Sequence, residues 1–83
     1  MEPPRNVVGP QVRKIRQTRN LSQEAFAAKC QRSGWDISRD IVARIELQTR
    51  LVPDFELEPL ATNLNVTPKE LFPEDWNQIP SKK

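Results

Sequence analysis

The segment from Ile37 to Ile45 constrains the fold of this chain more than any other. Isoleucine stands at positions 37, 41 and 45, with Val42 beside them. Residues three and four apart share one face of an α-helix, so these side chains form an apolar stripe that must be buried. Ser38 is a candidate N-cap for this helix. The same geometry exposes the opposite face, which carries Arg39, Asp40, Ala43 and Arg44.

Two helices are predicted before this segment. Gly9-Pro10 favours a helix start, because proline at the first helical position costs no hydrogen bond. With Asn20 as a left-handed stop, the first helix is expected over about Pro10–Arg19. A second helix is expected over about Ser22–Ser33, with a serine cap at its start and Gly34 at its end.

Two more helices are predicted after it. Asp54 is a candidate cap for the fourth, and Pro59 allows two interpretations: the helix starts near Leu57, so that the proline falls in its first turn, or the helix bends there. Thr67-Pro68-Lys69-Glu70 combines a capping box with proline at the first helical position and predicts a short fifth helix. The apolar stripe of the fourth helix is Leu57, Leu60, Ala61 and Leu64.

Five short helices without any strand pattern predict an all-α fold. The chain has 83 residues, about the size of one domain with one core. We expect a flexible N-terminal arm over residues 1–8, a domain over 9–73 and an irregular C-terminal tail over 74–83.

Several classes of protein are excluded by what the sequence lacks. It has one cysteine, Cys30, and no histidine, so the usual metal-ligand and acid–base sets are absent, and we predict no enzyme, no metal and no cofactor. We expect Cys30 to be a small core residue and Trp35 to serve packing. Because the sequence has neither an apolar run of roughly 18 residues nor a signal-peptide pattern, we expect a cytoplasmic protein without a membrane partner.

Charge is divided unevenly between two parts of the chain. Residues 1–50 carry ten Lys or Arg against five Asp or Glu, a balance of +5. Residues 51–83 carry three Lys against six Asp or Glu, a balance of −3. A phosphate-facing surface requires a basic part of this kind, although ordinary surface charge explains the same numbers.

The pattern over residues 9–72 resembles the XRE family of Cro- and phage-repressor-type helix-turn-helix regulators. The resemblance implies a compact five-helix, lambda-repressor-like DNA-binding domain whose second and third helices form the helix-turn-helix. It rests on Val12-x-x-Ile15-Arg16, Asn20-Leu21-Ser22-Gln23-Glu24-x-Phe26-Ala27, Ile37-Ser38-x-x-x-Val42-x-Arg44-Ile45-Glu46 and Leu60-Ala61-x-x-Leu64-x-Val66-x-x-x-x-Leu71.

The resemblance implies that a recognition helix over about residues 38–47 reads base edges in the major groove. Arg39 or Arg44 would bond guanine, Asp40 would accept a hydrogen bond from a cytosine amine, and Ala43 would touch a thymine methyl group. Asp40 and Arg44 have an alternative as a surface ion pair four residues apart, and Asp40 also suits the positive end of the helix.

Phosphate contacts are expected around the start of the second helix, where free N–H groups favour an anion. Ser22 can cap this helix, and the resemblance implies a backbone contact for Gln23. It also implies a mainly architectural salt bridge between Arg16 and Glu46. For Arg13, a solvated surface position without a DNA contact is as good an interpretation as a phosphate contact. The further phosphate candidates are Arg13, Arg16, Ser38, Thr49 and Arg50.

Two features depart from the family pattern. Leu47-Gln48 stands where the family has glycine, so either Gln48 adopts a left-handed conformation at a cost of about 1 kcal/mol or the helix continues into Thr49. The connection Gln31–Asp36 is longer than the usual tight turn. We interpret it as an extra turn on the second helix, with Trp35 covering the apolar gap.

We predict a transcriptional regulator, in the first place a repressor, that binds specific double-stranded DNA as a homodimer, because one such domain buries little DNA surface. No small-molecule substrate is indicated. The alternative is an adaptor or antitoxin-like module that keeps the fold without DNA readout. The arm around Arg5 either reaches a groove or is flexible. The candidate dimer surface, which has the alternative of only closing the core, is Leu71, Phe72 and Trp76.

Overall fold

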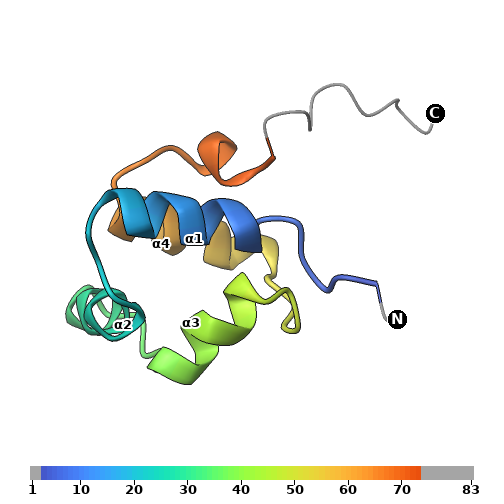
Figure 1. Cartoon of the computed structure of the whole chain (residues 1–83). Helices are drawn as coiled ribbons and strands as arrows, with labels where there is room; N and C mark the ends of the chain where they lie inside the picture. The colour runs from blue at the N-terminus through green and yellow to red at the C-terminus, as the bar shows by residue number, and fades with distance from the viewer. Residues whose placement is uncertain (1–2, 74–83) are drawn as a thin grey trace.

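The predicted helices are present in the computed structural model, which describes residues 3–73 (Figure 1). Since no strand occurs within that range, the all-α prediction is confirmed. The fifth predicted helix is a single 3-10 turn. The elements are α1 (Gly9–Thr18), α2 (Gln23–Arg32), α3 (Arg39–Glu46), the 3-10 turn η1 (Asp54–Glu56), α4 (Leu57–Leu64) and the 3-10 turn η2 (Pro68–Leu71).

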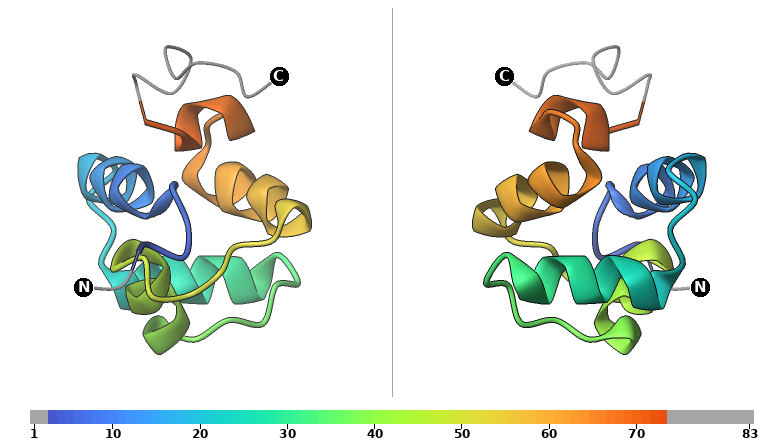
Figure 2. Two further views of the ribbon diagram at one scale, coloured as in Figure 1. Left: turned by 90° about the vertical axis from the view of Figure 1, so that its right-hand side faces the viewer. Right: turned by 90° about the vertical axis from the view of Figure 1, so that its left-hand side faces the viewer.

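One core joins these elements. Helices α1 and α4 lie side by side, with α2 and α3 below them and η2 above (Figures 1 and 2). Phe26 of α2, Ile45 of α3, Leu60 and Leu64 of α4, and Leu71 of η2 are all fully buried. Each such side chain contributes roughly 1.5–3 kcal/mol of transfer free energy. The predicted apolar stripes of α3 and α4 therefore both face this core.

The predicted caps form at the starts of α2, α3 and η2. The hydroxyl oxygens of Ser22 and Ser38 each accept a hydrogen bond from the backbone N–H three residues on, at 2.9 and 3.3 Å. In the capping box of η2, the Glu70 carboxylate accepts from both the backbone N–H and the hydroxyl of Thr67, at 2.9 Å each. These hydrogen bonds favour the charged carboxylate and lower the pKa of Glu70.

The ends of the helices use left-handed backbone. Asn20 after α1 has φ 60° and Gly34 after α2 has φ 99°, as the sequence predicted. At the family's glycine position, α3 ends at Glu46 and Gln48 takes φ 63°, so the left-handed alternative is the one realised. A hydrogen bond from Gln48 Nε2 to the Asn6 carbonyl, 2.9 Å, offsets part of the conformational cost.

Pro59 lies in the first turn of α4, because the regular helix starts at Leu57. The first of the two interpretations of this proline is therefore confirmed. Asp54, in contrast, is not the cap of a helix: it is the first residue of η1, and Pro53 precedes it in the cap position without a side-chain hydrogen bond. A separate 3-10 turn thus occupies the residues that were predicted to cap α4.

Residues 5–8 of the N-terminal segment, for which a flexible arm was expected, make contacts with the domain. Val8 is 2% exposed, and the Arg5 backbone N–H donates to the Gln48 carbonyl at 2.8 Å. Asn6 Nδ2 donates to the carbonyls of Ile45 and Arg50 at 3.1 and 2.8 Å. At the C-terminal end of α3, the Asn6 side chain therefore takes a place that water would otherwise occupy. The tail over residues 74–83 lies outside the described residues.

Cys30 of α2 belongs to the core, and Trp35 of the α2–α3 connection packs against it. Cys30 is fully buried and Trp35 packs against the core, as predicted. Of the longer connection Gln31–Asp36, only Gln31 and Arg32 are helical, as the last residues of α2. The predicted extra turn on this helix is therefore short, because the backbone beyond Gly34 is not helical. Burial raises the pKa of the Cys30 thiol to about 11.

Gly9→Ala is expected to destabilise the domain by about 1–3 kcal/mol, because the new methyl group would overlap the Ile45 carbonyl oxygen and crowd that of Glu46. Urea denaturation measures the change, with exposed Gln17→Ala as a control that should stay within roughly 0.5 kcal/mol of the wild type. Alanine is the better helix former, so a Gly9→Ala protein more stable than wild type would contradict this close approach.

The raised pKa of Cys30 predicts a loss of stability at high pH. The unfolded thiol ionises near pH 9, whereas the folded thiol stays neutral until about pH 11, so unfolding releases a proton between these values. Stability is fully present below pH 9 and falls as pH rises toward 11. Comparison with Cys30→Ala separates this fall in the free energy of unfolding from the effect of lysine titration. If the free energies of unfolding of the two proteins changed in parallel with pH, the prediction would be refuted.

Candidate nucleic-acid interface

Helix α3 is fixed to the domain by one face. Val42 and Ile45 are 1% and 0% exposed, and Ile41 is half-buried against the core. The helix packs on α2 on one side and on α1 on the other. Its apolar stripe therefore sets which side chains point to solvent.

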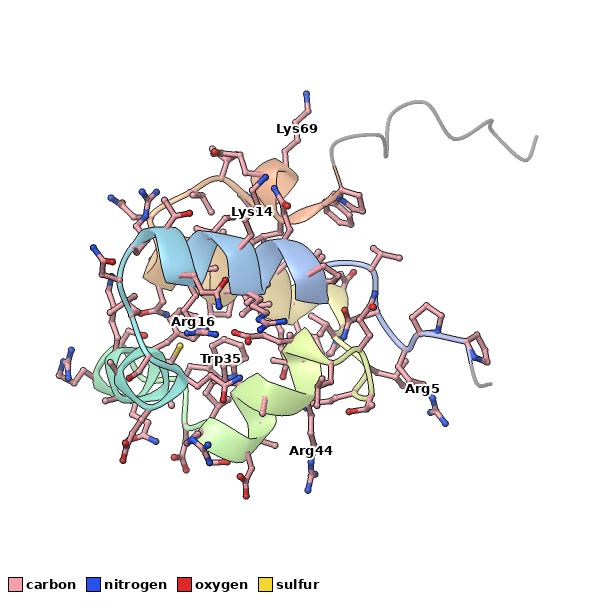
Figure 3. All side chains as sticks on the ribbon, in the orientation of Figure 1. Arg5, Lys14, Arg16, Trp35, Arg44 and Lys69 are labelled. Carbon is pink, nitrogen blue, oxygen red and sulfur yellow. The ribbon has the colours of Figure 1, made fainter. Side chains whose placement is uncertain are left out.

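The outward face of α3 carries the residues that were predicted to read bases. Arg39, Asp40 and Arg44 are exposed and Ala43 is half-buried. Figure 3 shows Arg44 pointing away from the body of the domain. Within residues 3–73 no ion pair joins Asp40 to Arg44, so the predicted surface pair does not form. These guanidinium and carboxylate groups are left to water or to a ligand.

A buried ion pair joins α1 to α3 behind this face. The Arg16 guanidinium meets the Glu46 carboxylate in a bidentate arrangement, Nε to Oε2 at 2.6 Å and Nη2 to Oε1 at 3.1 Å. Both residues are less than 9% exposed. Arg16 Nη1 also donates to the Leu21 carbonyl at 2.6 Å, so its donors are turned inward and its role is architectural.

Helix α2 is tied into the same cluster through its first residue. Gln23 is half-buried, and its Nε2 donates to Glu46 Oε1 at 3.0 Å. Ser22 is exposed beside it. The first-turn N–H groups of a helix have no intrahelical partner, and Ser22 satisfies only the one it caps. The α2 start therefore presents free donors next to a side chain that is anchored to α3.

The remaining phosphate candidates fall into two groups. Arg13, Ser38 and Thr49 are exposed; the Thr49 hydroxyl donates to the Arg44 carbonyl at 3.3 Å. Arg50 is instead held by Glu56, with Nη1 to Oε1 at 2.7 Å and Nη2 to Oε2 at 3.2 Å, and this hydrogen bonding raises the Arg50 pKa. Arg50 therefore stabilises the connection between α3 and α4 through its ion pair with Glu56.

Two of the three dimer candidates, Leu71 and Phe72, lie within the described residues. Leu71 is fully buried and Phe72 packs against the core, in line with the alternative that they close it. Trp76 lies outside the described residues. Self-association through these residues stays a prediction.

The residues that hold the C-terminal end of α3 were not predicted from the sequence. Asn6 donates to the last turn of α3, and its Oδ1 accepts from the Gly9 backbone N–H at 2.8 Å. Only the last of these hydrogen bonds joins residues that are close in the sequence, Asn6 and Gly9. The pairing of Asn6 with Gln48 had no local signal, because these residues are 42 positions apart.

Within residues 3–73, four α-helices in which α3 packs against α2 and exposes a polar face define a helix-turn-helix protein. A family model described as helix-turn-helix matches residues 12–71, most of the chain. This chain belongs to the XRE-type helix-turn-helix family. A search among curated proteins found no match.

Among solved structures, the chain is similar to the restriction-modification controller protein C.AhdI from Aeromonas hydrophila. The two share 32% sequence identity with a TM-score of 0.68, over 78% of this chain and 87% of that one. The family and this neighbour place the chain among DNA-binding transcription regulators and agree with the expectation that it is not an enzyme. Within residues 3–73, no helix is long and apolar enough to span a bilayer, and no cluster of ligand-type residues is placed to hold a metal ion.

Glu46→Ala is expected to destabilise the domain by about 3–5 kcal/mol, because it leaves the buried Arg16 guanidinium without its partner. Gln23→Ala removes one neutral donor from the same carboxylate and should cost only about 1 kcal/mol. Urea denaturation of both variants measures the difference. The double variant Arg16→Met/Glu46→Leu should recover much of the loss; equal effects of Glu46→Ala and Gln23→Ala would contradict this view of the pair.

Proposed function

We propose that this chain binds a specific double-stranded DNA operator with α3 in the major groove. It acts as a transcriptional repressor where that operator overlaps a promoter. The main support for this function is that α3 has two different faces. One face is locked to α1 and α2 by apolar packing and by Glu46, and the other exposes Arg39, Asp40 and Arg44 without internal partners.

The exposed α3 residues match the chemistry of base edges. An arginine can donate two hydrogen bonds to guanine O6 and N7, and we assign this role to Arg39 and Arg44. Asp40 would accept from a cytosine amine, and Ala43 is small enough to contact a thymine methyl group. Arg39 and Asp40 lie in the first turn of α3, the part of a recognition helix that reaches deepest into the groove.

Phosphate contacts would fix the register of α3 in the groove. We assign them to Ser22 and Gln23 at the start of α2, and to the exposed Ser38, Thr49 and Arg13. The positive end of the α2 dipole favours a phosphate at Ser22. Because its amide is bonded to Glu46, Gln23 would couple such a phosphate to the position of α3.

The operator predicted for this protein is twofold symmetric, because one domain of this size buries too little DNA for nanomolar binding. Two copies on half-sites one helical turn apart would double the contact area. A homodimer is therefore part of the proposal. The similarity to a restriction-modification controller protein supports a role in transcription control.

Selection of bound duplexes from a random pool tests the proposal. Arg39→Ala should raise the Kd for the selected duplex roughly 5- to 150-fold, from about 1–3 kcal/mol for a bidentate base contact, and should relax the preference at one position of each half-site. Lys69→Ala is the matched control, since Figure 3 places Lys69 on the side opposite α3. An unchanged selected sequence for Arg39→Ala would remove the base-reading role.

The salt dependence of binding separates this function from that of an adaptor. A DNA binder that neutralises several phosphates should lose affinity steeply between 50 and 200 mM salt, on the order of 10³-fold for six contacts. Affinity should also differ between selected and random duplexes. A flat salt dependence together with equal affinity for all sequences would favour the protein-interaction alternative.

A further inference from the structure

A hollow of about 440 Å³ lies between the end of α2 and α4. It is lined by residues 33–35, where α2 passes into the α2–α3 connection, and by four residues of α4: Glu58, Pro59, Thr62 and Asn63. Figure 2 shows the end of α2 and the start of α4 on the same side of the domain. Small-molecule sites occupy roughly 300–1,000 Å³, so this α2–α4 hollow has the size for one small ligand.

The apolar part of the α2–α4 hollow comes from two rings. The α2–α3 connection is longer than the family's usual tight turn, and its extra length includes Trp35. Trp35 packs against the core and is half-buried, so part of its indole stays open to the hollow. Pro59 of α4 is half-buried in the same lining. These rings offer a surface on which the apolar body of a ligand can pack.

The charge of the lining favours a cation. Glu58 is exposed, and among residues 3–73 its carboxylate takes part in no ion pair. The described lining contains no lysine or arginine, so a cation in the hollow meets no like charge there. The indole face of Trp35 also attracts a cation, because the aromatic quadrupole is negative over the ring. Carboxylate and indole therefore select for the same sign of charge.

Asn63 leaves a hydrogen-bond acceptor open in the hollow. The residue is 4% exposed, and its Nδ2 donates to Ser33 Oγ at 3.1 Å and to the Pro59 carbonyl at 2.8 Å. Both amide hydrogens are thus used, whereas Oδ1 accepts no hydrogen bond from the described residues. No fully buried side-chain oxygen in this part of the chain lacks a partner, so solvent reaches Asn63 Oδ1. An acceptor of this kind recognises a ligand that carries N–H groups.

We infer that the α2–α4 hollow binds a small organic cation with N–H donors, a primary ammonium or a guanidinium group on an apolar body. The charged nitrogen pairs with Glu58 and donates to Asn63 Oδ1. The apolar body packs on Trp35 and Pro59. None of the residues assigned to DNA contact lines the hollow, so the inference stands independently of the proposed function. The connection continues into Ser38, the cap of α3, so the ligand touches the segment that leads to the recognition helix.

Phenethylammonium tests the inference, with phenethyl alcohol as its neutral counterpart on the same apolar body. Binding is followed by NMR through the indole N–H signal of Trp35, which Trp76→Phe distinguishes from that of the second tryptophan. We expect a saturable shift with a Kd of about 1 mM for phenethylammonium, since a ligand of so few atoms reaches only modest affinity. The alcohol should bind at least about fivefold more weakly, because it lacks the cation–π and carboxylate attraction.

Glu58→Gln removes the charge and keeps the shape, so the preference for phenethylammonium over the alcohol should fall roughly two- to fivefold at low salt. Glu24→Gln is the matched control. Glu24 is exposed and is the second residue of α2, as Glu58 is of α4, but it does not line the hollow. Its preference should equal that of wild type.

Thr62→Lys is a second variant, made at an exposed residue of the lining. It places an ammonium group four residues after Glu58, where the two side chains pair along α4. The protein then supplies its own cation to the hollow. The Kd for phenethylammonium should rise at least about fivefold. The dispersion of the backbone NMR signals verifies that each variant is folded.

Any of four results overturns the inference. The first is no saturable shift of the Trp35 indole signal in wild type up to about 10 mM phenethylammonium, roughly ten times the expected Kd. The second is equal binding of phenethyl alcohol, which would mean that the hollow selects an apolar body and not a cation. The third is a preference in Glu58→Gln that is unchanged or that Glu24→Gln loses equally. The fourth is wild-type binding of phenethylammonium by Thr62→Lys.

Discussion

The ion pair between Arg16 and Glu46 is the interaction on which the arrangement of this domain depends. It lies between α1 and α3 with both side chains buried, and Glu46 also accepts a hydrogen bond from Gln23 at the start of α2. A buried charge pair is tolerated only when its geometry is good and its remaining donors are satisfied, and the bond to the Leu21 carbonyl completes this set. One carboxylate thus fixes three helices relative to each other.

The other end of α3 is held by a different means. Asn6 binds the last turn of α3, and Gln48 in its left-handed conformation returns a hydrogen bond to the Asn6 carbonyl. Helix α3 is therefore anchored along its length, and its outward face has little freedom. Base readout needs this rigidity, because hydrogen bonds that discriminate between bases tolerate only small errors in position.

Much of the fold could be predicted because it is encoded locally. The isoleucine spacing of α3 and the serine caps of α2 and α3 depend on neighbours within one or two turns, and the exposed face with Arg39 and Arg44 follows from the same periodicity. The contacts of Asn6 and the pairing of Arg50 with Glu56 could not be predicted in this way, because they depend on how distant or looped segments meet. The fifth helix was overestimated for a related reason: a capping box marks a start and says nothing of length, and η2 ends at Leu71.

Operator recognition by this protein requires that the outward face of α3 meets base edges while its inner face stays locked to the domain. A structure of the protein bound to its selected duplex tests this most directly. We expect the guanidinium groups of Arg39 and Arg44 within hydrogen-bond distance of guanine O6 and N7, with the Arg16–Glu46 pair intact. A complex in which α3 lies outside the major groove, or in which another surface contacts the bases, would contradict it.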